Sequence, residues 1–312
     1  MAVHISEDLL NAPARRTARL AALELLGRVR ETRDRLEHAH DDDALHDFRV
    51  AIRRLRSWLR TFHDVLDDTL PAKPERRLKR VARATSASRD LEVHIAWVEE
   101  RRKTLRGPRR AGADWLLERL NDRKLSCDAE LRRVVDSTMD RVVARIDEAM
   151  RCYLTSVVDP EPTFTDVMSD LVRMRAETLE KALGRISTVG DRAEAHAARI
   201  EAKRLRYLLE PLDETKPDVR PVIAELTEMQ DRLGELHDAQ LFGSEIASLV
   251  AEVLAQQSNA TAGEAGADTV PGLMAMSRSL RKAEERAFAE VERQWLGKKG
   301  KKVAQRAVEA IA

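Results

Sequence analysis

The chain has 312 residues, of which 43% are hydrophobic and 35% charged, with 12 glycines, 10 prolines and 4% aromatic residues. This balance is typical of helical proteins and disfavours a β-rich fold. The 55 basic residues nearly balance the 54 acidic ones and leave a net charge of +1, whereas a general nucleic-acid-binding domain is usually strongly basic. An anion-binding site must therefore come from local segregation of charge.

Apolar residues recur at spacings of three and four through nearly the whole sequence, which predicts an all-α fold. In chain order the predicted helices span residues 13–40, 43–67, 73–105, 111–157, 163–188, 191–213, 217–257 and 271–296. Turn-forming residues separate them, at 41–43, 70–71, 107–108, 159–162, 190–191 and 216–217. We expect a flexible loop between Gln256 and Gly272 and a solvated basic tail at the GKKGKK run, residues 297–302.

Two segments resemble each other at an offset of 150 positions. Residues 46–62 read HDFRVAIRRLRSWLRTF, and residues 196–212 read HAARIEAKRLRYLLEPL. The identical pairs are His46/His196, Arg49/Arg199, Arg54/Arg204, Leu55/Leu205, Arg56/Arg206 and Leu59/Leu209, and Arg53 matches Lys203. A weaker match at an offset of 148 pairs Arg89-Asp90 with His237-Asp238. The repeat predicts a tandem duplication of a four-helix unit, with residues 1–158 as the first half and residues 159–312, including the basic tail, as the second.

Each repeated segment divides into a basic and an apolar face. At about 100° per residue, His46, Arg49, Arg53, Arg56 and Arg60 fall on one stripe of the first helix, opposite Phe48, Ile52 and Leu55. His196, Arg199, Lys203 and Arg206 form the stripe of the second helix. Glu210 occupies the position of Arg60 and interrupts that stripe at its far end.

Such uncompensated cations repel one another, so an anion should neutralise them. The stripe from residue 46 to residue 60 is about 21 Å long at ~1.5 Å per residue. A compact phosphate would reach two of its side chains, whereas a linear phosphate chain would engage the whole row. Arginine suits this role because its planar guanidinium binds phosphate oxygens in bidentate geometry. If the two basic helices face one another, they form the walls of a channel.

Other roles for these residues stay open. The stripes can be solvated faces that pair with acids of neighbouring helices, and the two histidines can cap their helices. Arg89 and His237 can reach the same channel or pair with the adjoining aspartates, and Tyr207 can bind the anion or simply pack. The positions four residues after each histidine hold Val50 and Ile200 instead of metal ligands, so we expect no metal site. No catalytic or nucleotide-binding motif is present, and no residue stands out as a nucleophile or general base.

The duplicated H-x-x-R-x-x-x-[RK]-R-L-R pattern, followed by RDLEV and by LGELHDAQ, resembles the CHAD domain, the conserved histidine α-helical domain. The resemblance spans approximately residues 10 to 295. It implies two four-helix bundles related by a pseudo-two-fold axis, with a basic central channel that binds inorganic polyphosphate, and association of bacterial members with polyphosphate granules. Some members carry a triphosphate-tunnel domain that supplies catalysis, for which this chain has no room, so the expected function is binding without catalysis or cofactors.

The resemblance implies that the polyphosphate-binding residues are His46, Arg49, Arg53, Arg56, Arg60, His196, Arg199, Lys203, Arg204 and Arg206. Secondary candidates are Arg54, Arg89, Tyr207 and His237. The alternatives are a general polyanion-binding or nucleic-acid-binding module and an enzyme that acts on polyphosphate. The sequence does not predict an oligomeric state.

Location is predicted from what the sequence lacks. Cys127 and Cys152 are the only cysteines and lie 25 residues apart in one predicted helix, too far to form a disulfide. The N-terminus has no signal-peptide core, and no apolar run approaches the roughly 20 residues that span a bilayer. We therefore expect a cytoplasmic protein without membrane contact.

Overall fold

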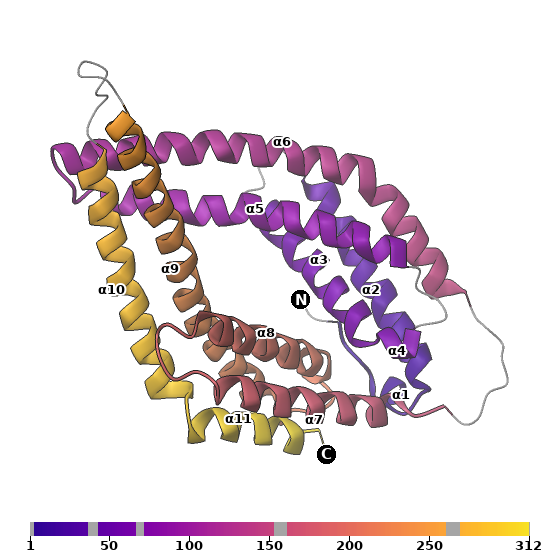
Figure 1. Ribbon diagram of the computed structural model, residues 1–312. Helices are drawn as coiled ribbons and strands as arrows, with labels where there is room; N and C mark the ends of the chain where they lie inside the picture. Colours follow the sequence, from indigo (N-terminus) through magenta and orange to yellow (C-terminus); the bar gives the residue numbers. More distant parts are fainter. Residues whose placement is uncertain (1–2, 37–42, 67–71, 153–160, 260–268, 312) are drawn as a thin grey trace.

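The computed structural model describes residues 3–36, 43–66, 72–152, 161–259 and 269–311 (Figure 1). Within these ranges the chain forms helices and no β-strand, apart from a single β-bridge between Pro13 and Thr163. The all-α prediction is therefore confirmed. The turn predicted at 70–71, the centre of the loop predicted between Gln256 and Gly272, and the predicted boundary between residues 158 and 159 lie outside the described residues.

The first part of the chain contains α1 (Glu7–Leu10), α2 (Ala14–Arg35), α3 (Ala44–Thr61), α4 (His63–Leu66), α5 (Ala72–Arg102) and α6 (Pro108–Arg151). The second part contains α7 (Phe164–Leu183), α8 (Arg192–Leu209), the 3-10 helix η1 (Glu210–Leu212), α9 (Val219–Asn259), α10 (Val270–Trp295) and α11 (Lys298–Glu309). Each part thus supplies four long helices in the same order, which agrees with the predicted elements. The symmetry relation between the parts stays a prediction of the sequence repeat.

Local sequence explains where two of these helices begin. Gly107 has a φ of 52°, which favours glycine, and it reverses the chain before Pro108 occupies the first position of α6. Thr163 and Asp166 form a capping box at the start of α7, in which each side chain accepts a hydrogen bond from the other residue's backbone N–H. The starting points of both helices therefore follow from residues that can be identified in the sequence.

The prediction of a solvated tail at residues 297–302 is wrong. Gly297 has a φ of 80° and ends α10, after which the chain enters α11. The basic run is the polar start of an amphipathic helix, because Val303, Ala304 and Ala307 are buried. These residues belong to the same hydrophobic cluster as residues of α7. The charge run concealed the apolar positions that follow it.

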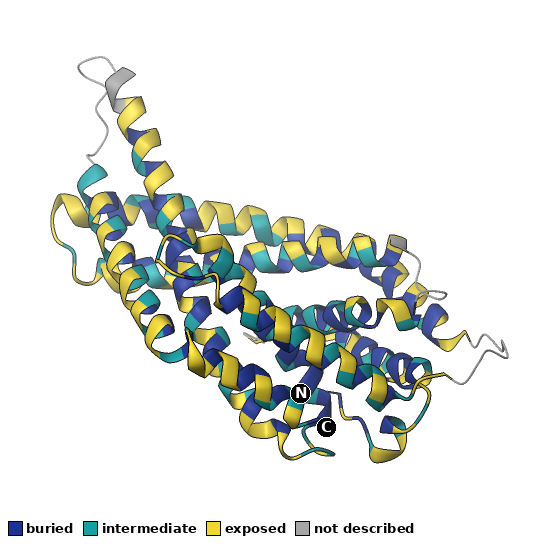
Figure 2. Ribbon diagram, turned by 60° about the horizontal axis from the view of Figure 1, so that its bottom comes forward, coloured by how far each residue is buried: buried dark blue, intermediate teal, exposed yellow. Residues whose placement is uncertain are grey.

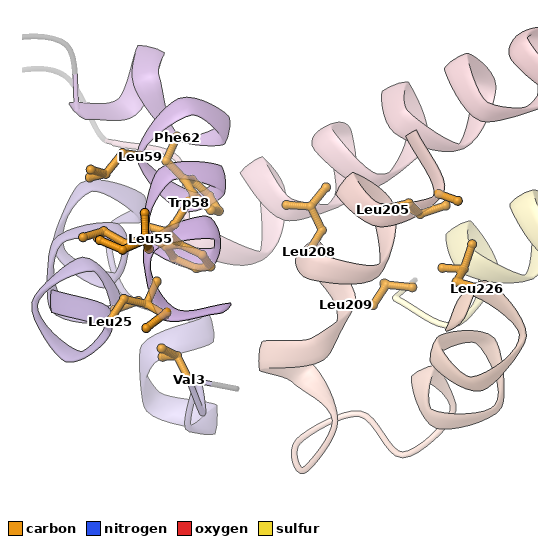
Figure 3. Close-up of a cluster of buried hydrophobic side chains, with 14 of the residues drawn as sticks. Val3, Leu25, Leu55, Trp58, Leu59, Phe62, Leu205, Leu208, Leu209 and Leu226 are labelled. Atoms are coloured by element: carbon orange, nitrogen blue, oxygen red, sulfur yellow. The ribbon is translucent and has the colours of Figure 1, made fainter. Parts of the chain in front are cut away.

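The hydrophobic core is shared by both parts of the chain. Trp58 of α3 and Phe62, which directly follows α3, stack with Phe164 of α7, with ring centroids 6.2 Å and 5.4 Å from that phenylalanine. The largest cluster of buried residues accordingly includes α2 and α3 together with α7 and α8 (Figure 3). Buried residues follow the inward faces of the helices, and exposed residues follow the outward faces (Figure 2). The two parts therefore pack as one body around α3 and α8.

A second, smaller cluster lies where the far ends of the long helix pairs α5–α6 and α9–α10 meet. It contains Leu91, Leu116, Phe242 and Leu273. Figure 1 shows that these pairs diverge from the main core and approach each other again at this end. The long helices therefore frame a region in which α3, α5 and α8 come together.

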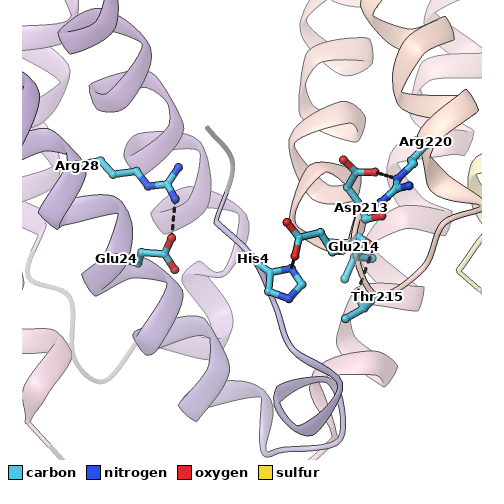
Figure 4. A network of polar contacts seen from close by, with 8 residues as sticks. His4, Glu24, Arg28, Asp213, Glu214, Thr215 and Arg220 are labelled. Carbon is cyan, nitrogen blue, oxygen red and sulfur yellow. Dashed lines mark hydrogen bonds and ion pairs between the residues drawn. The ribbon is translucent and has the colours of Figure 1, made fainter.

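The N-terminal segment ties the first part of the chain to η1. Val3 and Ile5 are buried, and the Ile5 N–H donates to the Pro211 carbonyl over 3.0 Å. His4 Nδ1 lies 3.3 Å from a carboxylate oxygen of Glu214 (Figure 4). Val3 and Ile5 of this segment thus belong to the main core.

Candidate functional site

A basic cleft of about 500 Å³ lies between α3, α5 and α8. Its cationic lining consists of Arg49, Arg53, Arg56 and Arg60 from α3, Arg83 from α5, and Lys203 and Arg204 from α8. Among the described residues, only two carboxylates, Glu75 and Asp90 of α5, line the cleft with them. The cleft therefore concentrates positive charge in a protein whose net charge is close to zero.

The opposite faces of α3 and α8 explain why these cations point into the cleft. Phe48, Ile52 and Leu55 have no exposed surface, and Ala198 and Leu205 are equally buried. Burial of these apolar stripes leaves the basic stripe of each helix on the side that faces the partner helix. The structure thus places Arg53 and Lys203 in the lining of the same cleft.

Three arginines of the cleft have a buried hydrogen-bond donor without an acceptor. The Nε–H groups of Arg49, Arg53 and Arg204 are buried without a hydrogen-bond partner among the residues that the structure describes. Burial, followed by the charge of Arg53, lowers the pKa of Arg49, and burial also lowers the pKa of Arg56 and Arg60. Buried guanidinium donors without acceptors are costly, so an anion with several oxygens would stabilise this cleft.

One ion pair in the cleft is weak. Arg49 Nη2 lies 4.0 Å from Asp90 Oδ1. Burial is the largest influence on both groups, and it raises the pKa of Asp90 while it lowers that of Arg49. Each shift disfavours the charged form. Asp90 therefore offsets the charge of Arg49 only in part.

Lys203 is the one lysine that lines the cleft in the described part of the chain. Burial and the nearby charges of Arg53, Arg199 and Arg49 lower its pKa from 10.5 to about 7. Its ammonium group is therefore protonated in only part of the molecules near neutral pH. A bound anion would restore its charge.

The predicted histidines lie outside the cleft lining. His46 is exposed near the start of α3. The His196 and His237 rings lie 4.5 Å apart, between α8 and α9, and Arg199 lies beside Gly234 of α9. Burial is the largest cause of the lowered pKa of both rings, and Arg199 lowers both further. His196, His237 and Arg199 therefore flank the cleft on the α9 side.

Several other candidates have protein partners, and one arginine of the cleft, Arg204, pairs with Glu201 of the same helix. Glu210 contacts Arg54 over 2.9 Å and Arg206 over 3.4 Å. Arg89 pairs with Glu92 over 2.8 Å. The aromatic ring of Tyr207 lines the cleft and lies 5.2 to 5.9 Å from the guanidinium carbons of Arg53, Arg54 and Arg206. Tyr207 thus gives the cleft an aromatic edge, and Glu210 holds two arginines behind it.

Sequence reasoning missed Arg83 and Glu75. Both lie on α5 and line the cleft. Arg83 has no cationic equivalent at an offset of 148 or 150, and Glu75, although it matches Glu225 at an offset of 150, lies outside the two similar segments. The signal was the basic run ERRLKRVAR at residues 75–83, where Arg76, Lys79 and Arg83 follow helical spacing. A repeat identifies symmetric contributions to a site, and α5 contributes asymmetrically.

The described ranges contain no group of three or more histidine, cysteine, aspartate or glutamate side chains with the arrangement of a metal site. Cys127 and Cys152 are free. Over the same ranges, no helix is long and apolar enough to span a bilayer.

Comparisons with known proteins agree on one fold. The family model for the CHAD domain matches residues 20–247. A crystal structure of the CHAD domain from the plant Ricinus communis is 20% identical, with a TM-score of 0.64, and the match covers 99% of this chain and 95% of that one. PptA from Streptomyces chartreusis is 13% identical, with a TM-score of 0.67, and the match covers 96% of this chain and all of that one. No curated protein matches the chain.

Proposed function

This chain belongs to the CHAD domain family, and on that premise we propose that it binds inorganic polyphosphate in the cleft between α3, α5 and α8 without catalysing its conversion. The observation that carries the proposal is the facing of Arg53 and Lys203, each within a row of cations, across one cleft. We propose that this cleft is the channel expected from the sequence. The primary contacts are Arg49, Arg53, Arg56, Arg60, Lys203 and Arg204.

A linear phosphate chain fits this set better than a compact anion does. Arg49 and Arg60 stand eleven positions apart on α3, which places them about 16 Å apart along the helix axis at ~1.5 Å per residue. Repeated phosphate oxygens along that length would supply acceptors to each guanidinium in turn. His46, His196 and Arg199 extend the same row beyond the cleft, and we propose them as flanking contacts.

In a cell, such a protein would associate with polyphosphate granules, since these are the places where long chains accumulate. Binding would depend on salt, because phosphate neutralisation by arginine and lysine releases counterions. Binding would not depend on nucleotide sequence. The described lining of the cleft offers cations and one aromatic ring rather than a set of hydrogen-bond donors and acceptors that distinguishes one base from another.

The test is a titration of the purified chain with long-chain polyphosphate at two salt concentrations. The variants are an Arg53→Gln/Lys203→Gln pair and, as a matched control, Lys298→Gln/Lys299→Gln, which removes two exposed charges from the start of α11. We expect tight, salt-dependent binding that the cleft variant loses and the control retains. Helical content measured by circular dichroism establishes that both variants fold.

Equal loss of binding in the two variants would show that overall charge, and not the cleft, attracts the ligand. Competition separates polyphosphate from nucleic acid: polyphosphate should displace single-stranded DNA far more readily than the reverse. Release of inorganic phosphate from polyphosphate, with and without added divalent cations, tests for an enzyme. The proposal expects none.

A further inference from the structure

Lys203 is a primary amine surrounded by guanidinium groups. The charged neighbours that shift its pKa are Arg49 and Arg53 from α3 and Arg199 and Arg206 from α8. Glu75 and Asp90 are the carboxylates of the cleft among the described residues, and Asp90 is engaged by Arg49. Beyond Arg199 stand His196 and His237, whose rings face each other. Lys203 therefore combines a nucleophilic atom with a set of anion-binding groups.

This combination differs from that of a lysine on the surface. A lysine that is desolvated or placed beside another cation retains a free electron pair on nitrogen near neutral pH, and it then acts as a nucleophile. The arginines cannot do so, because they stay protonated. The cleft, at about 500 Å³, has room for a small anion beside the amine.

We propose that Lys203 is a modification site that accepts acyl groups from acyl phosphates, with the arginines that line the cleft holding the phosphate while the amine attacks the neighbouring carbonyl. Acyl phosphates carry an electrophilic carbon one bond from a dianionic phosphate. Recognition of the phosphate by Arg53 and Arg49 therefore delivers the reactive carbon to the only lysine within the cleft lining of the described residues.

The step is balanced without any other reagent. The Lys203 Nζ electron pair forms a bond to the acyl carbon, and the bond from that carbon to the phosphate oxygen breaks. Inorganic phosphate leaves with the electron pair, and the nitrogen releases one proton to water. The product is an amide, which carries no charge at neutral pH.

The consequence for regulation rests on the proposed function. Acylation removes the positive charge of Lys203 permanently and places an acyl group in the cleft, so a modified chain should bind polyphosphate more weakly. Bound polyphosphate should in turn protect the amine, since it occupies the same arginines. Polyphosphate and acyl phosphates would thus compete for the same cleft.

The experiment exposes the full chain to acetyl phosphate at pH 7.5 and follows each lysine by peptide mass spectrometry. Lys298 and Lys299, which are exposed on α11, serve as internal references. The free-amine fraction of a lysine whose pKa is near 7 exceeds that of an ordinary lysine by about 10² to 10³ at this pH, and a less basic amine is intrinsically less nucleophilic. We expect Lys203 to react at least about tenfold faster than the references.

Two further arms distinguish recognition from general reactivity. Arg53→Gln should slow acetylation of Lys203 by acetyl phosphate several-fold more than acetylation by acetic anhydride, which carries no phosphate, while the references react as before. Long-chain polyphosphate should protect Lys203 and leave the references unprotected. Acetylation of Lys203 at the rate of Lys298 in the wild-type chain would overturn the proposal.

The result is separable from the test of polyphosphate binding. If the unmodified chain bound no polyphosphate, the proposed function would fail, yet selective acetylation that depends on Arg53 would still establish the modification site. If the chain binds polyphosphate, acetylated wild type should bind more weakly. Lys203→Arg, which keeps the charge and lacks the amine, should then bind equally well before and after acetyl phosphate treatment.

Discussion

Arg53 and Lys203 occupy matching positions of the two similar sequence segments, and they line the same cleft from opposite helices. Among the charged neighbours of Lys203, Arg53 has the largest effect on its pKa. Positions 150 residues apart thus meet because α3 and α8 pack side by side around one core. The two cations repel each other because no acid lies between them, and a bound anion would remove this repulsion.

The first prediction concerns the pH dependence of polyphosphate binding. The pKa of Lys203 in the free protein is about 7, and a bound anion raises it, so binding takes up a proton above neutral pH. Affinity should therefore be highest below pH 7 and fall as pH rises, by the order of tenfold between pH 6.5 and 8.5. Titrations across that range measure the effect.

Lys203→Arg is the matched control for this dependence, because its charge is constant over the whole range. The variant should bind with an affinity that changes little between pH 6.5 and 8.5. Burial also lowers the pKa of His196 and His237, so their contribution would appear in both proteins below pH 6.5. A decline that persists unchanged in Lys203→Arg would assign the titration to other groups.

A second prediction concerns Glu210, whose side chain is 14% exposed and contacts Arg54 and Arg206. Glu210→Gln leaves two largely buried guanidinium groups beside a neutral side chain. The free energy of unfolding should fall by about 3 kcal/mol, as measured by urea denaturation. Polyphosphate binding should persist, since Glu210 and Arg206 do not line the cleft.

The control for that variant is Glu235→Gln, which removes an exposed partner of Arg232. Exposed ion pairs contribute little to stability, so its urea midpoint should match that of the wild type. Equal midpoints for all three proteins would contradict a structural role for Glu210.

The sequence predicted the long helices and the two faces of α3 because both follow from periodicity over many residues. Phe48, Ile52 and Leu55 are buried where the helical wheel placed the apolar face. The error at the solvated tail has the opposite cause: Val303 and Ala307 carry the apolar signal of α11, but they follow a short run of lysines that dominates local composition. At both places the spacing of apolar residues predicts the structure better than local composition does.

The candidate site was predictable where it repeats and not where it depends on tertiary packing. Arg53 and Lys203 stood out because their segments match. Arg83 enters the cleft only because α5 packs beside α3, and Arg54 reaches Glu210 only because α3 packs beside α8. Neither contact has a signature at fixed sequence spacing, so neither could be read from one sequence.

A third prediction tests the shared core. Phe164 of α7 is fully buried and stacks on Phe62, which directly follows α3. Phe164→Ala should lower the free energy of unfolding by about 3 to 5 kcal/mol. Because the core joins both parts of the chain, unfolding should remain a single transition when followed by tryptophan fluorescence and by circular dichroism. Two separate transitions in the wild type would indicate halves that unfold independently.

The final prediction concerns the crossing of α6 and α10. A Cβ on Gly112 would stand 2.8 Å from the Gly272 Cα, and a Cβ on Gly272 would stand 2.6 Å from the Gly112 Cα. Backbone atoms cannot move aside as a flexible side chain can, so Gly112→Ala should push the two helices apart. We expect a loss of about 1 to 3 kcal/mol in the free energy of unfolding.

Gly27 is the matched control, since it lies inside α2 and a Cβ at that position would have no described neighbour within 4 Å. Gly27→Ala should stabilise the chain by up to about 1 kcal/mol through helix propensity. Hydrogen exchange locates the difference: Gly112→Ala should speed exchange at the start of α6 and α10, near Leu116 and Leu273 of the smaller cluster, while α3 and α8 stay protected. Faster exchange throughout the chain would mean that this crossing is coupled to the whole core, and stability equal to that of the wild type would mean that the helices separate there without cost.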